Sequence, residues 1–85
     1  MTKADLLTIA GAVHDIGESA EHYVEFEFTP HRQEMQLYVF NKDADGNSDG
    51  ITDSLSVQKY DAEVRAWLTR WTERIRKERV LHGTH

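Results

Sequence analysis

The chain of 85 residues contains no cysteine, only one proline and no long apolar run. Without cysteine it has no disulfide, no thiolate nucleophile and no cysteine-ligated zinc, which favours a reducing compartment such as the cytoplasm. Its most apolar stretch, residues 4–13, is broken by Asp5, Thr8 and Gly11 and is far shorter than the roughly 20 residues that span a bilayer. Because no small-residue cleavage site follows it, we expect neither a membrane span nor a secretory signal.

Acidic and basic residues are unevenly divided along the chain. The net charge is −5, but residues 1–63 carry 13 acidic and four basic residues, whereas residues 64–85 carry two acidic and six basic ones. The latter bases alternate with apolar residues, which favours a basic helix on an acidic sheet or a solvated helix face; a nucleic-acid-binding arm is the alternative. These bases are Arg65, Arg70, Arg74, Arg76, Lys77 and Arg79.

The first part of the chain has the pattern of an amphipathic helix. Thr2, followed three residues later by Asp5, is typical of a helix N-cap. Gly17 lies on the apolar stripe, where it indicates a close packing contact or an early helix end. The stripe at helical spacing consists of Leu6, Ile9, Ala10, Val13, Ile16 and Ala20.

Two alternating segments, residues 22–29 and 34–41, predict a β-hairpin. If residues 30–33 form a four-residue loop, Thr29 faces Glu34 and the apolar residues of three successive inward pairs all fall on one face. A slip of one residue would destroy this match. The apolar pairs in this register are Phe28 with Met35, Phe26 with Leu37 and Val24 with Val39.

A polar loop over residues 43–50 precedes a third alternating segment and a final helix. In residues 51–57, Ile51, Leu55 and Val57 share the inward phase, and Asp53 falls in the same phase, as is typical of an edge strand. The final helix begins between residues 57 and 61, ends near residue 81, and Gly83 is a suitable stop. Its apolar stripe consists of Tyr60, Val64, Trp67, Leu68, Trp71 and Ile75.

These elements predict one α+β domain over residues 1–85, with a frayed tail from about residue 82. The composition, 39% hydrophobic and 29% charged, is that of a globular chain. The expected architecture is a two-layer αβββα sandwich, in which a three-stranded antiparallel meander is covered on one face by two helices.

The polar loop resembles a calcium-binding loop in its spacing. Asp45, Asn47 and Asp49 alternate before a glycine, and Asp53 would supply the ninth position. Ser56 stands where an EF-hand needs a bidentate glutamate, and the flanks are strands. A hydrophilic hairpin loop is therefore favoured, with weak calcium binding as the alternative.

The sequence lacks the patterns that carry hydrolytic or phosphate chemistry. It has no nucleophile elbow and no glycine-rich phosphate loop, and Ser19 has no evident base nearby in the sequence. We expect no enzyme, no cofactor and no metal centre.

The uncovered face of the sheet is the candidate binding surface. In the predicted register Tyr23 lies opposite Phe40 and Glu25 opposite Tyr38, with Ser54 and Ser56 alongside. The face is either a solvated surface with cross-strand pairs or an interface for a protein with a basic surface; a homodimer is a further alternative. The predicted contact residues are Tyr23, Glu25, Glu27, Gln36, Tyr38, Phe40, Asp43, Asp45 and Asp49.

The element order resembles that of double-stranded RNA-binding domains. Residues 23–40, with Pro30 and His31 in the turn, are similar to that family's first hairpin, which implies RNA binding. Where the family opens its last helix with a basic cluster, this chain has a single lysine, Lys59, and an acid, Asp61.

The order, the acidic charge, the size and the lack of cysteine also resemble small phage-encoded proteins, among them anti-CRISPR proteins that mimic DNA. That resemblance implies an inhibitor that occupies the DNA-binding groove of a nuclease in the host cytoplasm. It rests on topology and charge, and no residue motif is carried over.

Overall fold

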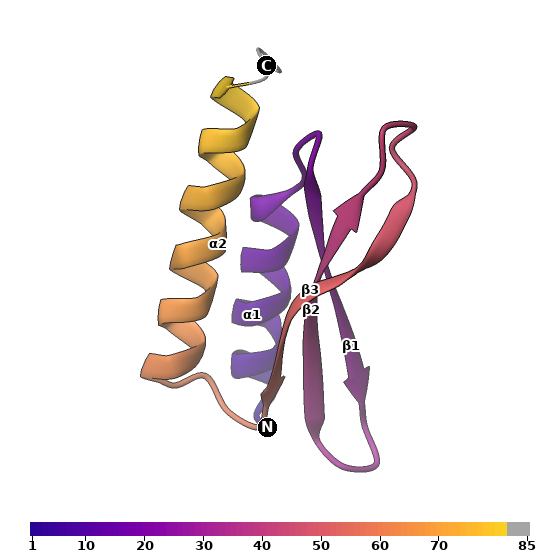
Figure 1. Ribbon diagram of the computed structural model, residues 1–85. Coiled ribbons are helices and arrows are strands. Elements are labelled where there is room, and N and C mark those ends of the chain that lie inside the picture. The colour runs from indigo at the N-terminus through magenta and orange to yellow at the C-terminus, as the bar shows by residue number, and fades with distance from the viewer. Residues whose placement is uncertain (82–85) are drawn as a thin grey trace.

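The computed structural model describes residues 1–81, so the predicted frayed tail lies outside the described residues. Two helices cover one face of an antiparallel sheet with strand order β1-β2-β3 (Figure 1). This confirms the α+β two-layer sandwich in αβββα order. The elements are α1 (Lys3–Ile16), β1 (His22–Thr29), β2 (Glu34–Lys42), β3 (Ser48–Val57) and α2 (Ala62–Leu81).

Helix α1 begins at the predicted cap and ends earlier than its apolar stripe suggests. The Thr2 hydroxyl accepts the Asp5 N–H at 3.0 Å. The helix stops before Gly17, whose φ of +68° lies in a region that glycine adopts without a Cβ penalty. Ala20, expected on the helix, is exposed beyond it, because the chain has already turned toward β1.

The register of β1 and β2 is the predicted one, from Val24–Val39 to Thr29–Glu34. The inward-facing residues of β2, the central strand, are fully buried. Phe26 of β1 lies on the same face but is 42% exposed, because an edge strand is only partly covered by the helices. The prediction that Phe26 is part of the covered core is therefore wrong.

Strand β3 is out of simple register with β2 at two places, and the first of them, at Thr52, changes the face that Ile51 presents. Val39 pairs with Asp53, but the next residue of β2, Phe40, pairs with Ile51, so Thr52 forms a β-bulge. Paired residues share a face of the sheet. Ile51 therefore lies beside Phe40 on the open face and is 53% exposed, which corrects the prediction that it faces the helices.

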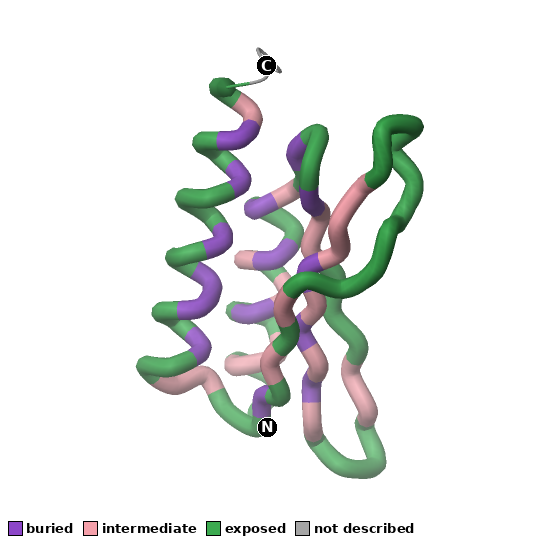
Figure 2. The backbone as a smooth tube through the Cα atoms, viewed as in Figure 1, coloured by how far each residue is buried: buried purple, intermediate pink, exposed green. Residues whose placement is uncertain are grey.

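The β2–β3 hairpin runs past the helices beyond this bulge. β3 begins at Ser48, three residues earlier than predicted, so the loop is shorter. Residues 43–52 are all exposed (Figure 2). At the tip, Asp43 Oδ1 accepts the N–H groups of Asp45 and Asn47 at 2.9 and 3.0 Å. The loop thus uses its first aspartate to fix its own turn.

Helix α2 contributes the largest buried side chains, as its apolar stripe predicts. The Trp71 indole N–H donates to Asp53 Oδ2 at 2.7 Å, which satisfies the inward-facing carboxylate of β3. The Trp67 indole N–H is buried without a partner in the described part of the chain. The buried apolar residues are Ile9, Val13, Ile16, Met35, Leu37, Val39, Val57, Val64, Trp67, Leu68, Trp71 and Ile75.

Candidate functional site

The open face of the sheet brings four apolar side chains together. The rings of Tyr23 and Phe40 are stacked, with centroids 5.0 Å apart and planes at 13°. The Tyr38 ring lies 5.9 Å from that of Phe40 at a tilt of 46°, and the bulge adds Ile51 on the other side of Phe40. We call Tyr23, Tyr38, Phe40 and Ile51 the aromatic patch. The first three were predicted from the register, whereas Ile51 was missed.

Carboxylates border the aromatic patch along β1. Glu25 pairs with Tyr38 and Glu27 with Gln36, and within residues 1–81 neither glutamate side chain forms a hydrogen bond or an ion pair. Gln36 is itself held in place, because its amide donates to Glu34 at 2.7 Å and accepts from Ser56 at 2.9 Å. The predicted contact residues of the two paired strands therefore do share one surface.

The lysine next to this surface does not offset its charge. Lys42 Nζ donates to the Glu18 carboxylate and to the Ser19 carbonyl oxygen, the latter at 2.8 Å. Only 12% of the Lys42 side chain is exposed. Because this cation is already paired, Glu25 and Glu27 give the open face a negative potential that attracts cationic groups.

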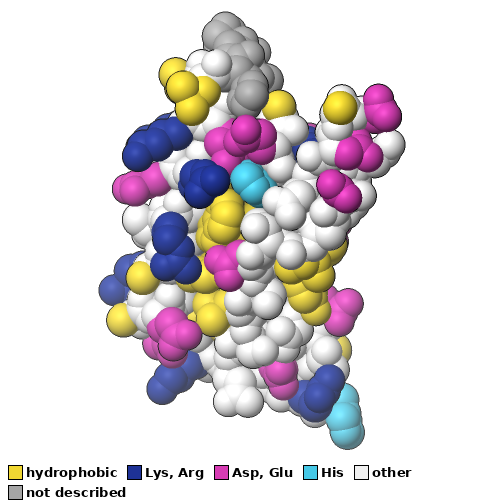
Figure 3. Space-filling model, viewed as in Figure 1, with side chains coloured by type: hydrophobic (Ala, Val, Ile, Leu, Met, Phe, Trp, Pro, Cys, Tyr) yellow, Lys and Arg dark blue, Asp and Glu magenta, His cyan; other side chains and the backbone are white. Residues whose placement is uncertain are grey.

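The predicted contact residues of the loop lie apart from the aromatic patch. Asp43, Asp45 and Asp49 are exposed at the end of the β2–β3 hairpin, where acidic side chains are visible at the upper right of Figure 3. Asp43 is engaged by the turn itself. The hairpin end is thus a second acidic region, separated from the patch along the strands.

The spacing that resembles a calcium loop does not form a cluster of ligand atoms. Among residues 1–81, Asp45, Asp49 and Asp53 are not gathered within 4.8 Å of one another. Asp53 Oδ2 instead accepts from the Trp71 indole, which fixes it on the helix side of the sheet. The bulge and this hydrogen bond are the physical reasons why Asp53 does not join the aspartates of the loop in a ligand cluster.

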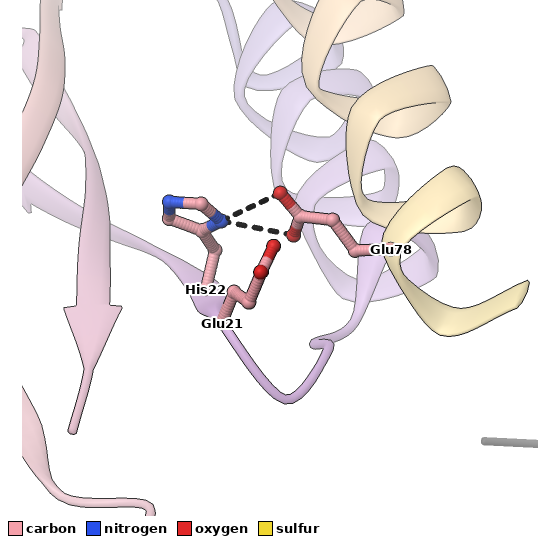
Figure 4. Close-up of side chains that lie close together, drawn as sticks. All are labelled: Glu21, His22 and Glu78. Atoms are coloured by element: carbon pink, nitrogen blue, oxygen red, sulfur yellow. Dashed lines mark hydrogen bonds and ion pairs between the residues drawn. The ribbon is translucent and has the colours of Figure 1, made fainter. Parts of the chain in front are cut away.

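A buried polar cluster links the start of β1 to the end of α2. His22 Nδ1 lies 2.9 Å from each carboxylate oxygen of Glu78 (Figure 4). The Ser19 hydroxyl donates to Glu78 at 2.7 Å, and Arg74 Nε donates to it at 2.9 Å. Glu78 and Ser19 are 3% and 4% exposed. We call these four residues the Glu78 cluster.

The Glu78 carboxylate is stabilised in its charged form. Burial by itself raises its pKa, but hydrogen bonds from His22 and Ser19, the charge of His22 and the hydrogen bond from Arg74 together outweigh burial. The pKa of Glu78 is therefore lower than its ordinary value of 4.5.

The Glu78 cluster contains a serine, a histidine and a glutamate, but not in the order that activates a nucleophile. In a catalytic triad the histidine bridges the hydroxyl and the acid. Here the Ser19 hydroxyl donates directly to Glu78, and His22 binds the same carboxylate. The arrangement ties two chain segments together through the Glu78 carboxylate.

Two members of the Glu78 cluster, together with Glu21, form the one set of potential metal ligands among residues 1–81. Glu21, His22 and Glu78 each offer a ligand atom, and these atoms lie within 4.8 Å of one another. The Arg74 guanidinium, bonded to the Glu78 carboxylate, opposes a second cation there. The hydrogen bonds account for the proximity of His22 and Glu78 without a metal.

Signals for the Glu78 cluster were present in the sequence. His22 falls in the alternating phase of Val24, which faces the helices. Glu78 follows Ile75 by three residues, so it lies on the buried stripe of α2. A histidine and a glutamate on facing buried surfaces predict each other as partners, because buried charges are paired.

Several bases of α2 already have partners within the protein. Arg74 binds Glu78, and Arg70 lies 3.9 Å from the Asp53 carboxylate. The Arg65 guanidinium lies over the Tyr60 ring, 5.5 Å from its centroid. Basic side chains nevertheless extend along the α2 side of the molecule (Figure 3).

Comparison of the chain with models of protein families, with curated proteins and with solved structures found no match. Neither helix within residues 1–81 is both long and apolar enough to cross a membrane. Both family resemblances therefore stay predictions.

Proposed function

We propose that this chain is a non-enzymatic protein-interaction module whose open sheet face binds a basic surface of a partner protein. The observation that supports this proposal is the aromatic patch, which neither helix of residues 1–81 covers and which Glu25 and Glu27 border. Aromatic side chains on an uncovered face supply large contact area at low entropic cost. The stacking of Tyr23 on Phe40 reduces that cost further, because the rings are already ordered.

Arginine on the partner fits this surface best. A guanidinium group stacks on a tyrosine or phenylalanine ring, with a contribution of about 0.5–1 kcal/mol at an exposed site. The same group donates to a carboxylate beside the ring, and Glu25 is placed for this next to Tyr38. The aliphatic part of the arginine side chain would cover Ile51.

A groove that ordinarily holds nucleic acid is the partner surface we favour. Such a groove presents arginine and lysine at the spacing of phosphates, and an acidic protein that occupies it acts as an inhibitor. The phage origin implied by the sequence resemblance and a cytoplasmic location belong to this proposal.

The proposal is tested by titrating the isotope-labelled protein with a short oligoarginine peptide and following its amide signals. We expect the largest shifts at Tyr23, Glu25, Tyr38 and Phe40. Replacing both Glu25 and Glu27 with glutamine should weaken binding roughly five- to tenfold, because two carboxylates are neutralised.

A variant of equal net charge separates a specific surface from general attraction. Glu63→Gln with Glu73→Gln removes two exposed carboxylates from α2 and should change the affinity less than about twofold. Equal weakening by the two double variants, or shifts centred on α2, would contradict the proposal.

Nucleic-acid binding through α2 is the second candidate function. It is supported by Arg76 and Lys77, which line one groove with the exposed Val80 and Leu81. A titration with duplex RNA and duplex DNA at about 50 mM salt tests it, since phosphate contacts are strong at low salt. Absence of binding under these conditions removes this candidate and leaves the first unaffected.

A further inference from the structure

Within residues 1–81, the outer edge of β1 is unpaired over the second half of the strand. The Lys42 N–H donates to the Glu21 carbonyl oxygen at 2.9 Å, and the register then runs through β1 without a break. Backbone groups alternate in direction along a strand, so the odd-numbered residues bond to β2. The N–H and C=O groups of Phe26 and Phe28 therefore point away from the sheet.

A groove of about 540 Å³ accompanies this edge on the helix side. It lies between the end of α1 and β1, and its apolar lining includes Val13, Val24 and Phe26. The isolated bridge between Glu18 and Tyr23 covers only the start of the edge. A side chain from an added strand could therefore enter the groove beside Phe26, which the helices leave 42% exposed.

The charge along the edge decides what can pair with it. Glu25 and Glu27 are exposed on the other face of the strand. If a second copy paired antiparallel through β1, the Glu25 and Glu27 side chains of the two copies would lie opposite one another, and like charges in that position are destabilising. The negative charges along this edge therefore oppose pairing with a second copy of the chain and favour pairing with a strand that carries positive charges.

We propose that β1 accepts an extended peptide as a fourth strand, with basic residues opposite Glu25 and Glu27 and an apolar residue opposite Phe26. Residues that face each other across two strands share a face, so the basic side chains reach the glutamates and the apolar one enters the groove. Main-chain hydrogen bonds supply affinity and the alternating side chains supply specificity. This inference goes beyond the proposed function, because it does not require the aromatic patch to bind.

The experiment uses a short peptide of alternating lysine and valine, added to the isotope-labelled protein. We expect the amide signals of Phe26 and Phe28 to shift and their hydrogen exchange to slow, because both N–H groups become hydrogen-bonded. The same peptide methylated on its backbone nitrogens keeps its charge but cannot complete the ladder, and should bind at least about tenfold more weakly.

A charge exchange provides the matched variant. Glu25→Lys with Glu27→Lys should lose about tenfold in affinity for the lysine–valine peptide and gain affinity for a glutamate–valine peptide. Glu63→Lys with Glu73→Lys makes the same change in net charge on α2 and should not reverse the preference. Far-UV circular dichroism checks that all variants are folded.

Three results would overturn the inference. The first is equal binding of the methylated peptide, and the second is a dimer formed through β1 in sedimentation of the protein alone. The third is a set of amide shifts confined to Tyr38 and Phe40, with none at Phe26 or Phe28; this result would leave the proposed function standing. Amide shifts at Phe26 and Phe28 alone would support the inference and contradict the proposed function.

Discussion

The Glu78 cluster allows a direct test of how the two layers are held together. Replacing Glu78 with glutamine keeps the size of the side chain but removes its charge. One amide oxygen then replaces two carboxylate oxygens that accept from His22, Ser19 and Arg74. The new NH₂ group also faces donors, so at least one buried donor loses its partner.

The expected loss of folding stability is large for a single isosteric change. Removing one side of a buried ion pair costs about 3–5 kcal/mol, because the other charge stays buried without compensation. Arg74 is largely exposed and can turn to water, which favours the lower end, about 3 kcal/mol. For a chain of this length this lowers the melting temperature by roughly 15 °C.

The pH dependence of folding stability provides an independent test of the Glu78 cluster. Because the pKa of Glu78 is lower in the folded protein than its ordinary value of 4.5, its charged form stabilises the fold above that value. This contribution is lost as the pH falls below 4.5 through the lowered folded-state pKa. The wild type should therefore lose stability in this range faster than Glu78→Gln, which has no carboxyl group to titrate at that position.

Urea unfolding followed by tryptophan fluorescence at pH 7 and at several values below 4.5 measures both effects. Glu73→Gln is the control, since Glu73 is exposed on the same helix and should change the free energy of unfolding by less than about 0.5 kcal/mol. If Glu78→Gln were as stable as this control, or showed the same acid dependence as the wild type, the reasoning about the cluster would be refuted.

The remaining predictions concern stability. Trp71→Phe should lower the free energy of unfolding by about 2 kcal/mol by leaving Asp53 without its indole donor, whereas Trp67→Phe should lower it clearly less, because within residues 1–81 the Trp67 N–H is buried without a partner. Paired urea titrations compare the two variants, and equal losses would contradict this. Gly17→Ala should lower the free energy of unfolding by about 1–3 kcal/mol, because the φ of +68° at this position strains any other residue. Thermal unfolding measures this loss. Thr2→Ala should cost about 1 kcal/mol through loss of the cap, seen as faster amide exchange in the first turn.

The parts of the fold that follow from local rules were predictable from the sequence. The Thr2 cap depends on residues three positions apart and the β1–β2 register on two strands joined by one short loop, and the structure confirms both. The phase of the strands likewise predicts Tyr23, Tyr38 and Phe40 on the open face.

The remainder depends on where the strands lie relative to the helices. Ile51 was assigned to the wrong face because the bulge at Thr52 inserts one residue, and the nearby Gly50, which has a positive φ within β3, was assigned to the loop. Phe26 was assigned to the core because alternation gives the face of a residue but not whether a helix extends over it. The pairing of His22 with Glu78 joins residues 56 positions apart, and it needed both elements to be considered together.

The bulge at Thr52 divides β3 into two parts that differ in how they open. The part after the bulge is anchored by Asp53 and Val57 against the core, whereas residues 43–52 belong to an exposed arm. Local opening of such an arm requires no exposure of the core, so its amides can exchange in a subglobal step while those of the inward-facing part need unfolding of the whole domain. A protease would accordingly find its first cleavage site in this arm, and the nicked chain would keep both layers joined.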